Sequence, residues 1–225
     1  GETADSLYGF NCLHQLYTRA NPDYSGRVTV PVLWDTELET IVSNESSEII
    51  RMFNSAFADY TPDKTDYYPE ELRNEIDSIN ARIYDTLNNG VYRCGFATTQ
   101  KAYEAAFSKL FVCLDELETK LSNQRFLLGS RITEADWRLF TTLIRFDAVY
   151  YSHFKTNLRR IFDYPALHGY TCDLYQQPGI KQTVDFEHIK QHYFFSHETI
   201  NPTRVVPVGP EINFEVHHER KKSFR

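Results

Sequence analysis

The stretch ITEADW, residues 132–137, fixes the start of a helix more clearly than any other part of the sequence. The Thr133 hydroxyl can cap the backbone N–H of Asp136, and the Asp136 carboxylate can reach back to the N–H of Thr133. Ile132 and Trp137 then stand as a hydrophobic staple on either side of this capping box. Because a cap contributes about 1 kcal/mol, these residues predict that a helix begins here, and their plain interpretation is structural.

Apolar residues on both sides of the box recur at intervals of three and four, which is the spacing of one helix face. The first such stripe ends at the helix-stopping sequence NNG, residues 88–90. The predicted helices cover residues 72–87, 106–121, 139–150, 164–175 and 185–196. They predict an all-helical domain over residues 70–200, and three prolines then predict an extended or partly disordered tail over residues 201–225.

The beginning of the chain has the pattern of a hairpin followed by a helix. Residues 28–33 are a β-branched run, and Pro31 inside it belongs at an edge, a strand start or a turn because proline cannot donate to a sheet ladder. A second run, residues 40–42, follows a polar turn, and cap-type residues 43–46 precede a helical pattern. A hairpin and one helix cannot bury both faces of a sheet. We therefore interpret residues 1–57 as part of a small α/β domain from which residues are missing.

Residues 58–69 are polar, contain two prolines and predict a linker. The predicted fold class is therefore α/β plus all-α. A partial α/β domain, the linker, the helical domain and the tail follow one another along the chain.

The composition excludes several classes of function. With 225 residues and 41% hydrophobic residues the chain is an ordinary globular protein, and its 16 Phe and 15 Tyr predict aromatic packing. A formal charge of −7 argues against nucleic acid as a partner. No signal peptide or long apolar run indicates a membrane partner.

The cysteines do not form a metal or redox motif, because none pairs at C-x-x-C spacing. We expect no metal site, and we expect reduced, buried thiols in a cytosol-like compartment. The cysteines are Cys12, Cys94, Cys113 and Cys172.

Several blocks of sequence, in the right order, resemble the glutathionyl-hydroquinone reductases, the omega-like xi class of the glutathione transferases. The blocks include residues 26–35, 41–46, 49–54, 88–92, 95–98, 145–147, 192–193 and 200–202. The resemblance runs from about residue 8 to about residue 210. It implies a partial thioredoxin-like domain followed by an all-helical glutathione-transferase domain, with glutathione as co-substrate. It also implies quinone-derived conjugates as substrates, and a cytoplasmic homodimer.

The resemblance also implies a glutathione site in the first domain. Its main-chain part comprises Arg27, Val28, Thr29 and Val30, followed by Pro31 with a cis peptide bond. An extended edge of this kind can pair with the cysteinyl backbone of a tripeptide. Glu45 and Ser46 would bind the γ-glutamyl end, since Glu45 can accept from its ammonium while Ser46 and the helix N-terminus favour its carboxylate. By themselves these two residues favour a simple helix cap, but the surrounding blocks favour binding.

Three tyrosines are the catalytic candidates that the resemblance implies. Tyr92 would give a proton to the departing hydroquinone and take it back. Tyr150 and Tyr193 would stabilise the catalytic thiolate by hydrogen bonding, which lowers the pKa of a thiol. In a chain with 15 tyrosines, a core aromatic with a satisfied hydroxyl is the alternative for each of them.

One departure from the family matters more than these matches. Its nucleophile lies in a Cys-Pro-aromatic-Ala motif, and no Cys-Pro pair occurs in this sequence. Cys12 stands too close to the hairpin, and the position of Cys94 is one where the family requires no cysteine, so no catalytic cysteine is assigned. We expect the motif to lie upstream, and this chain alone to be inactive. The alternatives are a non-catalytic binding protein and an omega-type thiol transferase.

Overall fold

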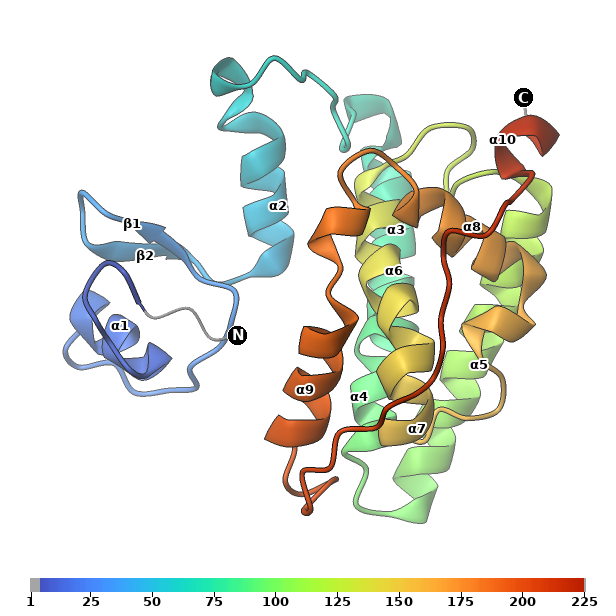
Figure 1. Ribbon diagram of the computed structural model, residues 1–225. Helices are drawn as coiled ribbons and strands as arrows, with labels where there is room; N and C mark the ends of the chain where they lie inside the picture. The colour runs from blue at the N-terminus through green and yellow to red at the C-terminus, as the bar shows by residue number, and fades with distance from the viewer. Residues whose placement is uncertain (1–4, 225) are drawn as a thin grey trace. The chain divides into compact units, whose positions relative to one another are not determined.

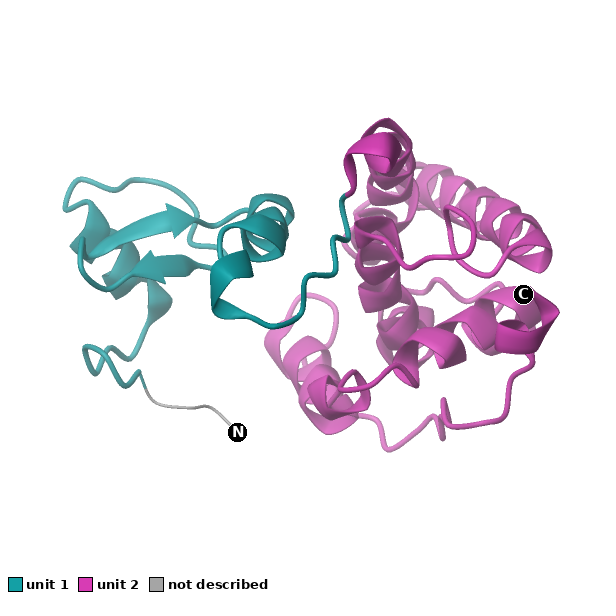
Figure 2. Ribbon diagram, turned by 90° about the horizontal axis from the view of Figure 1, so that it is seen from above, with its two compact units in different colours: residues 1–68 teal, residues 69–225 magenta. Residues whose placement is uncertain are grey.

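The computed structural model describes residues 5–224, and the chain divides into two compact units (Figure 1). Unit 1 is Gly1–Tyr68 and unit 2 is Pro69–Arg225, as Figure 2 shows in two colours. In the described part of the chain, no helix is long and apolar enough to cross a membrane.

Unit 1 contains a two-stranded antiparallel sheet with helices before and after it. Its elements are α1 (Leu13–Ala20), β1 (Leu33–Asp35), β2 (Thr40–Ser43), α2 (Ser46–Ser55) and η1 (Ala58–Tyr60). Leu33 pairs with Ser43 and Asp35 with Thr40, and Asp35 Oδ1 accepts from the N–H of Glu37 and of Leu38, both at 2.8 Å. The predicted hairpin and the helix after it are confirmed.

Two features of unit 1 differ from the prediction. The first strand begins at Leu33, so most of the β-branched run 28–33 lies outside the sheet, and no strand among residues 5–224 lies beside it. Helix α1 was not predicted, although Leu13, Leu16, Tyr17 and Ala20 recur at helical spacing over its eight residues. Gln15 Oε1 caps it by accepting from the N–H of Asn11 at 3.0 Å and of Cys12 at 2.9 Å.

The predicted linker packs back onto α2. Asn54 Nδ2 donates to Asp66 Oδ1 at 2.7 Å, and the N–H of Tyr67 donates to Asn54 Oδ1 at 2.8 Å. Residues 58–68 therefore belong to the same compact unit as the hairpin.

The named secondary-structure elements of unit 2 are all helical. Its elements are η2 (Glu70–Leu72), α3 (Arg73–Ile83), η3 (Tyr84–Asn88), α4 (Gly90–Gly95), α5 (Gln100–Asn123), α6 (Glu134–Arg145), η4 (Phe146–Tyr150), α7 (Tyr151–His153), η5 (Ile161–Asp163), α8 (Pro165–Tyr175), η6 (Lys181–Thr183), α9 (Phe186–Ser196) and α10 (Arg220–Ser223). Helix α6 contacts both α3 and α8 (Figure 1), and its Leu139 and Leu143 are fully buried. The apolar stripes thus form one core, as predicted.

The predicted capping box forms the N-terminus of α6. Asp136 is fully buried and its carboxylate accepts from the N–H of Thr133, from the N–H of Leu127 and from the hydroxyl of Tyr170, each at 2.8 Å. Burial raises the pKa of Asp136 although these donors oppose the shift. The box therefore fixes the start of the core helix and also ties it to α8 and to the preceding loop.

Two predicted helices end in π-helical segments. The stripe over 72–87 divides into α3 and η3, and the stripe over 139–150 divides into α6 and η4. In η3 the N–H of Asn89 donates to Tyr84 O at 2.9 Å, five residues back. Such segments are rare and occur frequently at functional sites. Apolar periodicity does not separate them from an α-helix.

The tail is extended over most of its length, as expected, but it is anchored rather than loose. Gln176 Nε2 donates to Phe214 O at 2.8 Å and to Val216 O at 2.9 Å, and the Phe214 side chain is buried. The chain ends in α10, whose buried Arg220 donates to the carbonyl groups of Leu121 at 3.0 Å and Gln124 at 2.8 Å. Arg220 therefore satisfies carbonyl groups at the C-terminal end of α5.

We expect residues 28–57 to exchange their amide hydrogens faster than the core helices α5 and α6. A two-stranded hairpin is marginally stable by itself, whereas α5 and α6 contribute the fully buried leucines of a multi-helix core. Hydrogen exchange read by mass spectrometry on residues 1–225 measures this directly. Equal protection in both units would mean that unit 1 closes its own core, and our interpretation of it as part of a domain would fail.

Candidate functional site

The predicted glutathione segment lies outside the sheet and leads into a cis peptide bond between Val30 and Pro31, as the resemblance implied. The Val30 side chain is 74% exposed. Tyr24 donates its hydroxyl to Arg27 O at 2.6 Å, which holds the beginning of the segment. In the part of the chain that the structure describes, no hydrogen bond engages the main chain of Val28 or Val30.

Tyr17 of α1 holds the middle of this segment. Its hydroxyl donates to Thr29 O at 2.7 Å and accepts from Thr29 N–H at 3.3 Å. It also accepts from Asn44 Nδ2 at 3.1 Å, and the same amide donates to Thr29 Oγ1 at 3.2 Å. Asn44 directly precedes Glu45, so this network brings the two predicted glutathione-binding stretches together. The sequence offered no signal for Tyr17 beyond its being one of many tyrosines.

Glu45 and Ser46 lie at the exposed start of α2. Glu45 is the N-cap residue, yet its side chain makes no capping hydrogen bond. Ser43, which precedes the helix, accepts through its Oγ from the N–H of Glu45 at 3.1 Å and donates to Glu48 Oε2 at 2.7 Å. The Glu45 carboxylate is therefore not engaged in the simple helix cap that was its alternative role.

The three predicted tyrosines of unit 2 form one chain of hydroxyl groups. The Tyr193 hydroxyl lies 2.6 Å from that of Tyr92 and 2.8 Å from that of Tyr150. They come from three elements, since Tyr92 is in α4, Tyr150 ends the π-helical η4 and Tyr193 is in α9. Burial, and then the neighbouring Tyr193 phenol, raise the pKa of Tyr92 and of Tyr150 well above the usual value. Both phenols are therefore protonated at neutral pH and can act as donors.

Phe154 lies at the centre of this group and was not predicted. Its ring is fully buried, stacks on Tyr150 with 5.5 Å between ring centroids, and lies 5.2 Å from the ring of Tyr92 and 5.9 Å from that of Tyr193. A Cβ atom at Gly95 would stand 2.1 Å from the same ring, so only glycine fits there. The ring therefore sets the positions of all three phenols.

Two histidines extend the aromatic group. His153 Nε2 and His197 Nδ1 are 3.1 Å apart, and the His197 ring stacks on Phe154 at 5.8 Å. Burial, reinforced by His197, lowers the pKa of His153 to about 4. Burial likewise lowers the pKa of His197. The pair is therefore neutral at pH 7. No sequence pattern linked these two positions, which are far apart in the chain.

The comparisons with known proteins identify the family. Residues 100–171 match the family described as glutathione S-transferase, C-terminal domain. The chain is 54% identical over 224 residues to the glutathionyl-hydroquinone reductase YqjG of Escherichia coli K12. The matched region covers 100% of this chain and 68% of that protein. It is 57% identical over 206 residues to the glutathionyl-hydroquinone reductase PcpF of Sphingobium chlorophenolicum. This match covers 92% of the chain and 66% of PcpF. The chain belongs to the glutathionyl-hydroquinone reductase family.

Solved structures of the same family agree with this assignment. The glutathione-bound structure of E. coli YqjG superposes with a TM-score of 0.97 at 54% identity, covering 100% of this chain and 73% of that one. A xi-class transferase from Natrialba magadii gives a TM-score of 0.96 at 47% identity, covering 99% and 68%. The predicted family and fold class are thus confirmed. The chain spans about two thirds of the length of the curated reductases that it matches.

The thiols of this reductase family member do not provide an obvious nucleophile. Cys94, Cys113 and Cys172 are buried, as expected, and burial raises the pKa of Cys94 and Cys172 to about 11 and also raises that of Cys113. Such thiols are protonated at neutral pH and react slowly. Cys12 is exposed, so the expectation that it is buried is wrong. It stands at the N-cap of the short helix α1, where little apolar surface covers it.

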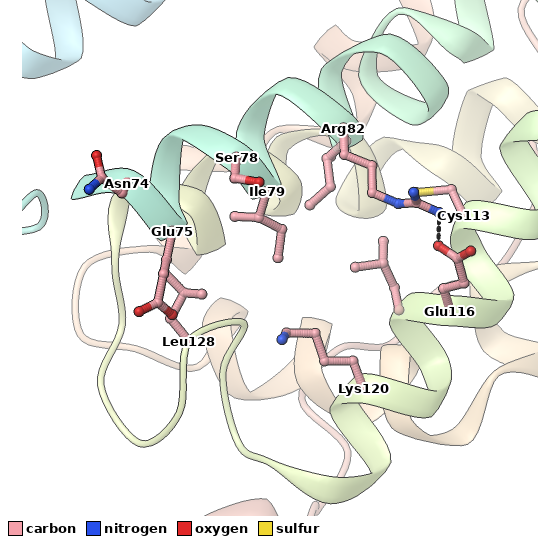
Figure 3. Close-up of a pocket in the computed structure, with 11 residues that line it drawn as sticks. Asn74, Glu75, Ser78, Ile79, Arg82, Cys113, Glu116, Lys120 and Leu128 are labelled. Carbon is pink, nitrogen blue, oxygen red and sulfur yellow. Dashed lines mark hydrogen bonds and ion pairs between the residues drawn. The ribbon is translucent and has the colours of Figure 1, made fainter. Parts of the chain in front are cut away.

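A separate cavity of about 650 Å³ lies between α3 and α5 (Figure 3). Its wall carries Cys113, Lys120 and the ion pair of Arg82 with Glu116. None of the tyrosines that the reductase family resemblance singles out lines it. This cavity therefore does not belong to the tyrosine group.

Proposed function

We propose that the complete protein reduces glutathionyl-hydroquinones to hydroquinones, with glutathione as co-substrate. The observation that carries this proposal is the chain of hydroxyl groups through Tyr92, Tyr193 and Tyr150. It occurs in a protein that is more than half identical to two named glutathionyl-hydroquinone reductases. These relatives do not favour a non-catalytic binding protein. The test is release of free hydroquinone from its glutathione conjugate by the complete protein.

The proposed reaction runs in two steps. A cysteine thiolate attacks the sulfur of the bound conjugate, the carbon–sulfur bond breaks, and its electron pair leaves with the ring, which gains a proton. The enzyme then carries a mixed disulfide with glutathione. A second glutathione, as thiolate, attacks this disulfide, which releases oxidised glutathione and restores the cysteine. We propose that the cysteine lies in a Cys-Pro-aromatic-Ala motif ahead of Gly1, since no Cys-Pro pair occurs in the 225 residues.

The tyrosine chain can supply one proton at a time. Three phenols carry three O–H groups, and the two internal contacts use two of them. One O–H is therefore left to point outward in every arrangement of the protons. We propose that Tyr92, which is half-buried whereas Tyr150 and Tyr193 are buried, presents it to the departing ring. When the catalytic cysteine is a thiolate, the O–H that is left over can instead be that of Tyr150 or Tyr193 and donate a hydrogen bond to the sulfur.

Glutathione binding is proposed for unit 1. Among residues 5–224 nothing bonds the main-chain groups of Val28 and Val30, which supports pairing with the cysteinyl backbone. No described residue engages the Glu45 carboxylate either, which supports binding of the γ-glutamyl ammonium. Arg27 and Ser46 complete the proposed set. The solved YqjG structure with bound glutathione supports the same ligand.

Glu45→Ala is expected to weaken glutathione binding about 10-fold to 150-fold in the complete protein. Removing one charged partner of a hydrogen-bonded ammonium costs about 1.5–3 kcal/mol. Isothermal calorimetry with glutathione measures the change, and Glu37→Ala, an exposed glutamate in the hairpin turn, is the matched control. An affinity as high as that of the control variant would remove Glu45 from the site.

We propose further that the protein is a cytoplasmic homodimer. Its cysteines are all unpaired, which supports a reducing compartment. Sedimentation of the complete protein tests the dimer.

A further inference from the structure

The Tyr17 hydroxyl has no hydrogen-bonding capacity left. Its one proton goes to Thr29 O, and its two acceptor positions face Thr29 N–H and Asn44 Nδ2. The side chain is only 2% exposed. A phenol in this state cannot transfer a proton to a substrate, so any role in the reaction must be exerted through the groups that it holds.

Those groups lie in the middle of the proposed glutathione segment. In an extended chain the N–H and C=O of one residue point to the same side, and those of its two neighbours point to the other side. Tyr17 engages both main-chain groups of Thr29. These two groups of Thr29 point to the same side because both reach one hydroxyl, and with the alternation of an extended chain those of Val28 and Val30 point away from Tyr17. No described residue bonds the main chain of Val28 or Val30.

We propose that Tyr17 is a positioning residue for glutathione. By holding Thr29 it turns the free groups of Val28 and Val30 toward the ligand. Through Asn44, which bonds both Tyr17 and Thr29, it fixes that edge relative to the start of α2, where Glu45 and Ser46 stand. One buried phenol thus sets the spacing between the parts that bind the cysteinyl and γ-glutamyl ends. The inference rests on the proposed function, because it assigns these stretches to glutathione.

The test compares Tyr17→Phe with the unmodified complete protein. The ring, which packs on Tyr24 at 5.0 Å between centroids, is retained, and only the hydroxyl is lost. We expect the Kd for glutathione and the KM for glutathione to rise at least about 10-fold, since three hydrogen bonds around the segment are lost together. The kcat should stay within about twofold, because the hydroxyl touches no reacting atom. Tyr8→Phe is the matched control, as its phenol bonds Trp34 and Glu39 of the hairpin instead.

A second variant separates positioning from stability. Asn44→Ala removes two bonds of the same network, and its effect on Kd should be much less than additive with that of Tyr17→Phe. Its effect should also be less than additive with that of Glu45→Ala, because Asn44 is proposed to act partly by placing Glu45. If Tyr17→Phe fails to fold, the Kd of Asn44→Ala, alone and combined with Glu45→Ala, still tests the inference.

Three results would overturn the inference in different ways. A Kd within twofold of the unmodified protein for Tyr17→Phe, while Glu45→Ala binds weakly, would show that Tyr17 positions nothing for a ligand that does bind there. If neither variant changes the affinity, the glutathione site itself is wrong, and the proposed function of unit 1 falls with it. A fall in kcat equal to the rise in KM would make Tyr17 a catalytic residue instead.

Discussion

Phe154→Ala is expected to lower the free energy of unfolding of the helical unit by about 3–5 kcal/mol, the usual cost of truncating a buried aromatic to alanine. The ring is fully buried and packs against Tyr92, Tyr150 and Tyr193. Its loss leaves a cavity beside three phenols whose hydroxyl groups must stay within hydrogen-bonding distance. We therefore expect stability and the geometry of the hydroxyl chain to fail together.

Urea unfolding of residues 1–225 measures this effect, because the chain has one tryptophan in each unit. In a Trp34→Phe background the fluorescence of Trp137 reports unit 2 alone. Phe162→Ala, at a ring that is 63% exposed, is the matched control and should cost less than about 0.5 kcal/mol. A Phe154→Ala variant as stable as this control would show that the ring is not the centre of the group.

A substitution at Gly95 tests the packing of the Phe154 ring independently. A methyl group there would overlap the Phe154 ring, so Gly95→Ala should itself destabilise the unit by about 1–3 kcal/mol. In a Phe154→Leu background the penalty should shrink, because the colliding ring atoms are gone. Equal penalties in both backgrounds would mean that Gly95 is required for another reason.

Periodicity and caps predicted the helical unit well. The capping box at Thr133 and Asp136 and the leucines of α5 and α6 follow local rules that tertiary contacts here reinforce. Where the strand prediction failed, the deciding contact was not local. The β-branched run that begins at Val28 predicts a strand, but a strand forms only when it pairs with a neighbouring strand. Among the described residues no strand pairs with the beginning of this run.

For the candidate site, too, some residues could be predicted from the sequence and others could not. Tyr92, Tyr150 and Tyr193 could be selected only through a family resemblance, because a tyrosine with a functional hydroxyl has the same spacing as one in a core. Phe154, His153 and Tyr17 were missed, since their importance lies in contacts that join distant parts of the chain. The π-helical turn that ends at Tyr150 was missed because apolar spacing cannot show a shift of hydrogen bonding by one residue.

The second large effect concerns the nucleophile. Residues 1–225 alone are expected to show no glutathione-dependent reductase activity, whereas a protein extended upstream to include a Cys-Pro-aromatic-Ala motif should be active. The reaction requires a sulfur that can exchange with the glutathione sulfur, and a phenol such as Tyr92 can move a proton but cannot form that disulfide. Cys94 and Cys172, with pKa values raised to about 11, are poor nucleophiles.

The exposed Cys12 makes a control essential. Its thiol is accessible, unlike the other three, so it is the one position in the described chain from which a relocated nucleophile would act most readily. Cys12→Ser and Cys94→Ser variants of residues 1–225, and the same changes in the extended protein, separate this possibility from the proposed mechanism. In the extended protein neither change should reduce the rate.

Single-turnover release of hydroquinone from its glutathione conjugate, measured for both lengths of the protein, tests the central claim most directly. We predict a rapid release by the extended protein, which is lost when the cysteine of its Cys-Pro motif is changed to serine, and no release by residues 1–225. Robust release by residues 1–225 that disappears with Cys12→Ser or Cys94→Ser would contradict the account, because the nucleophile would then lie within this chain.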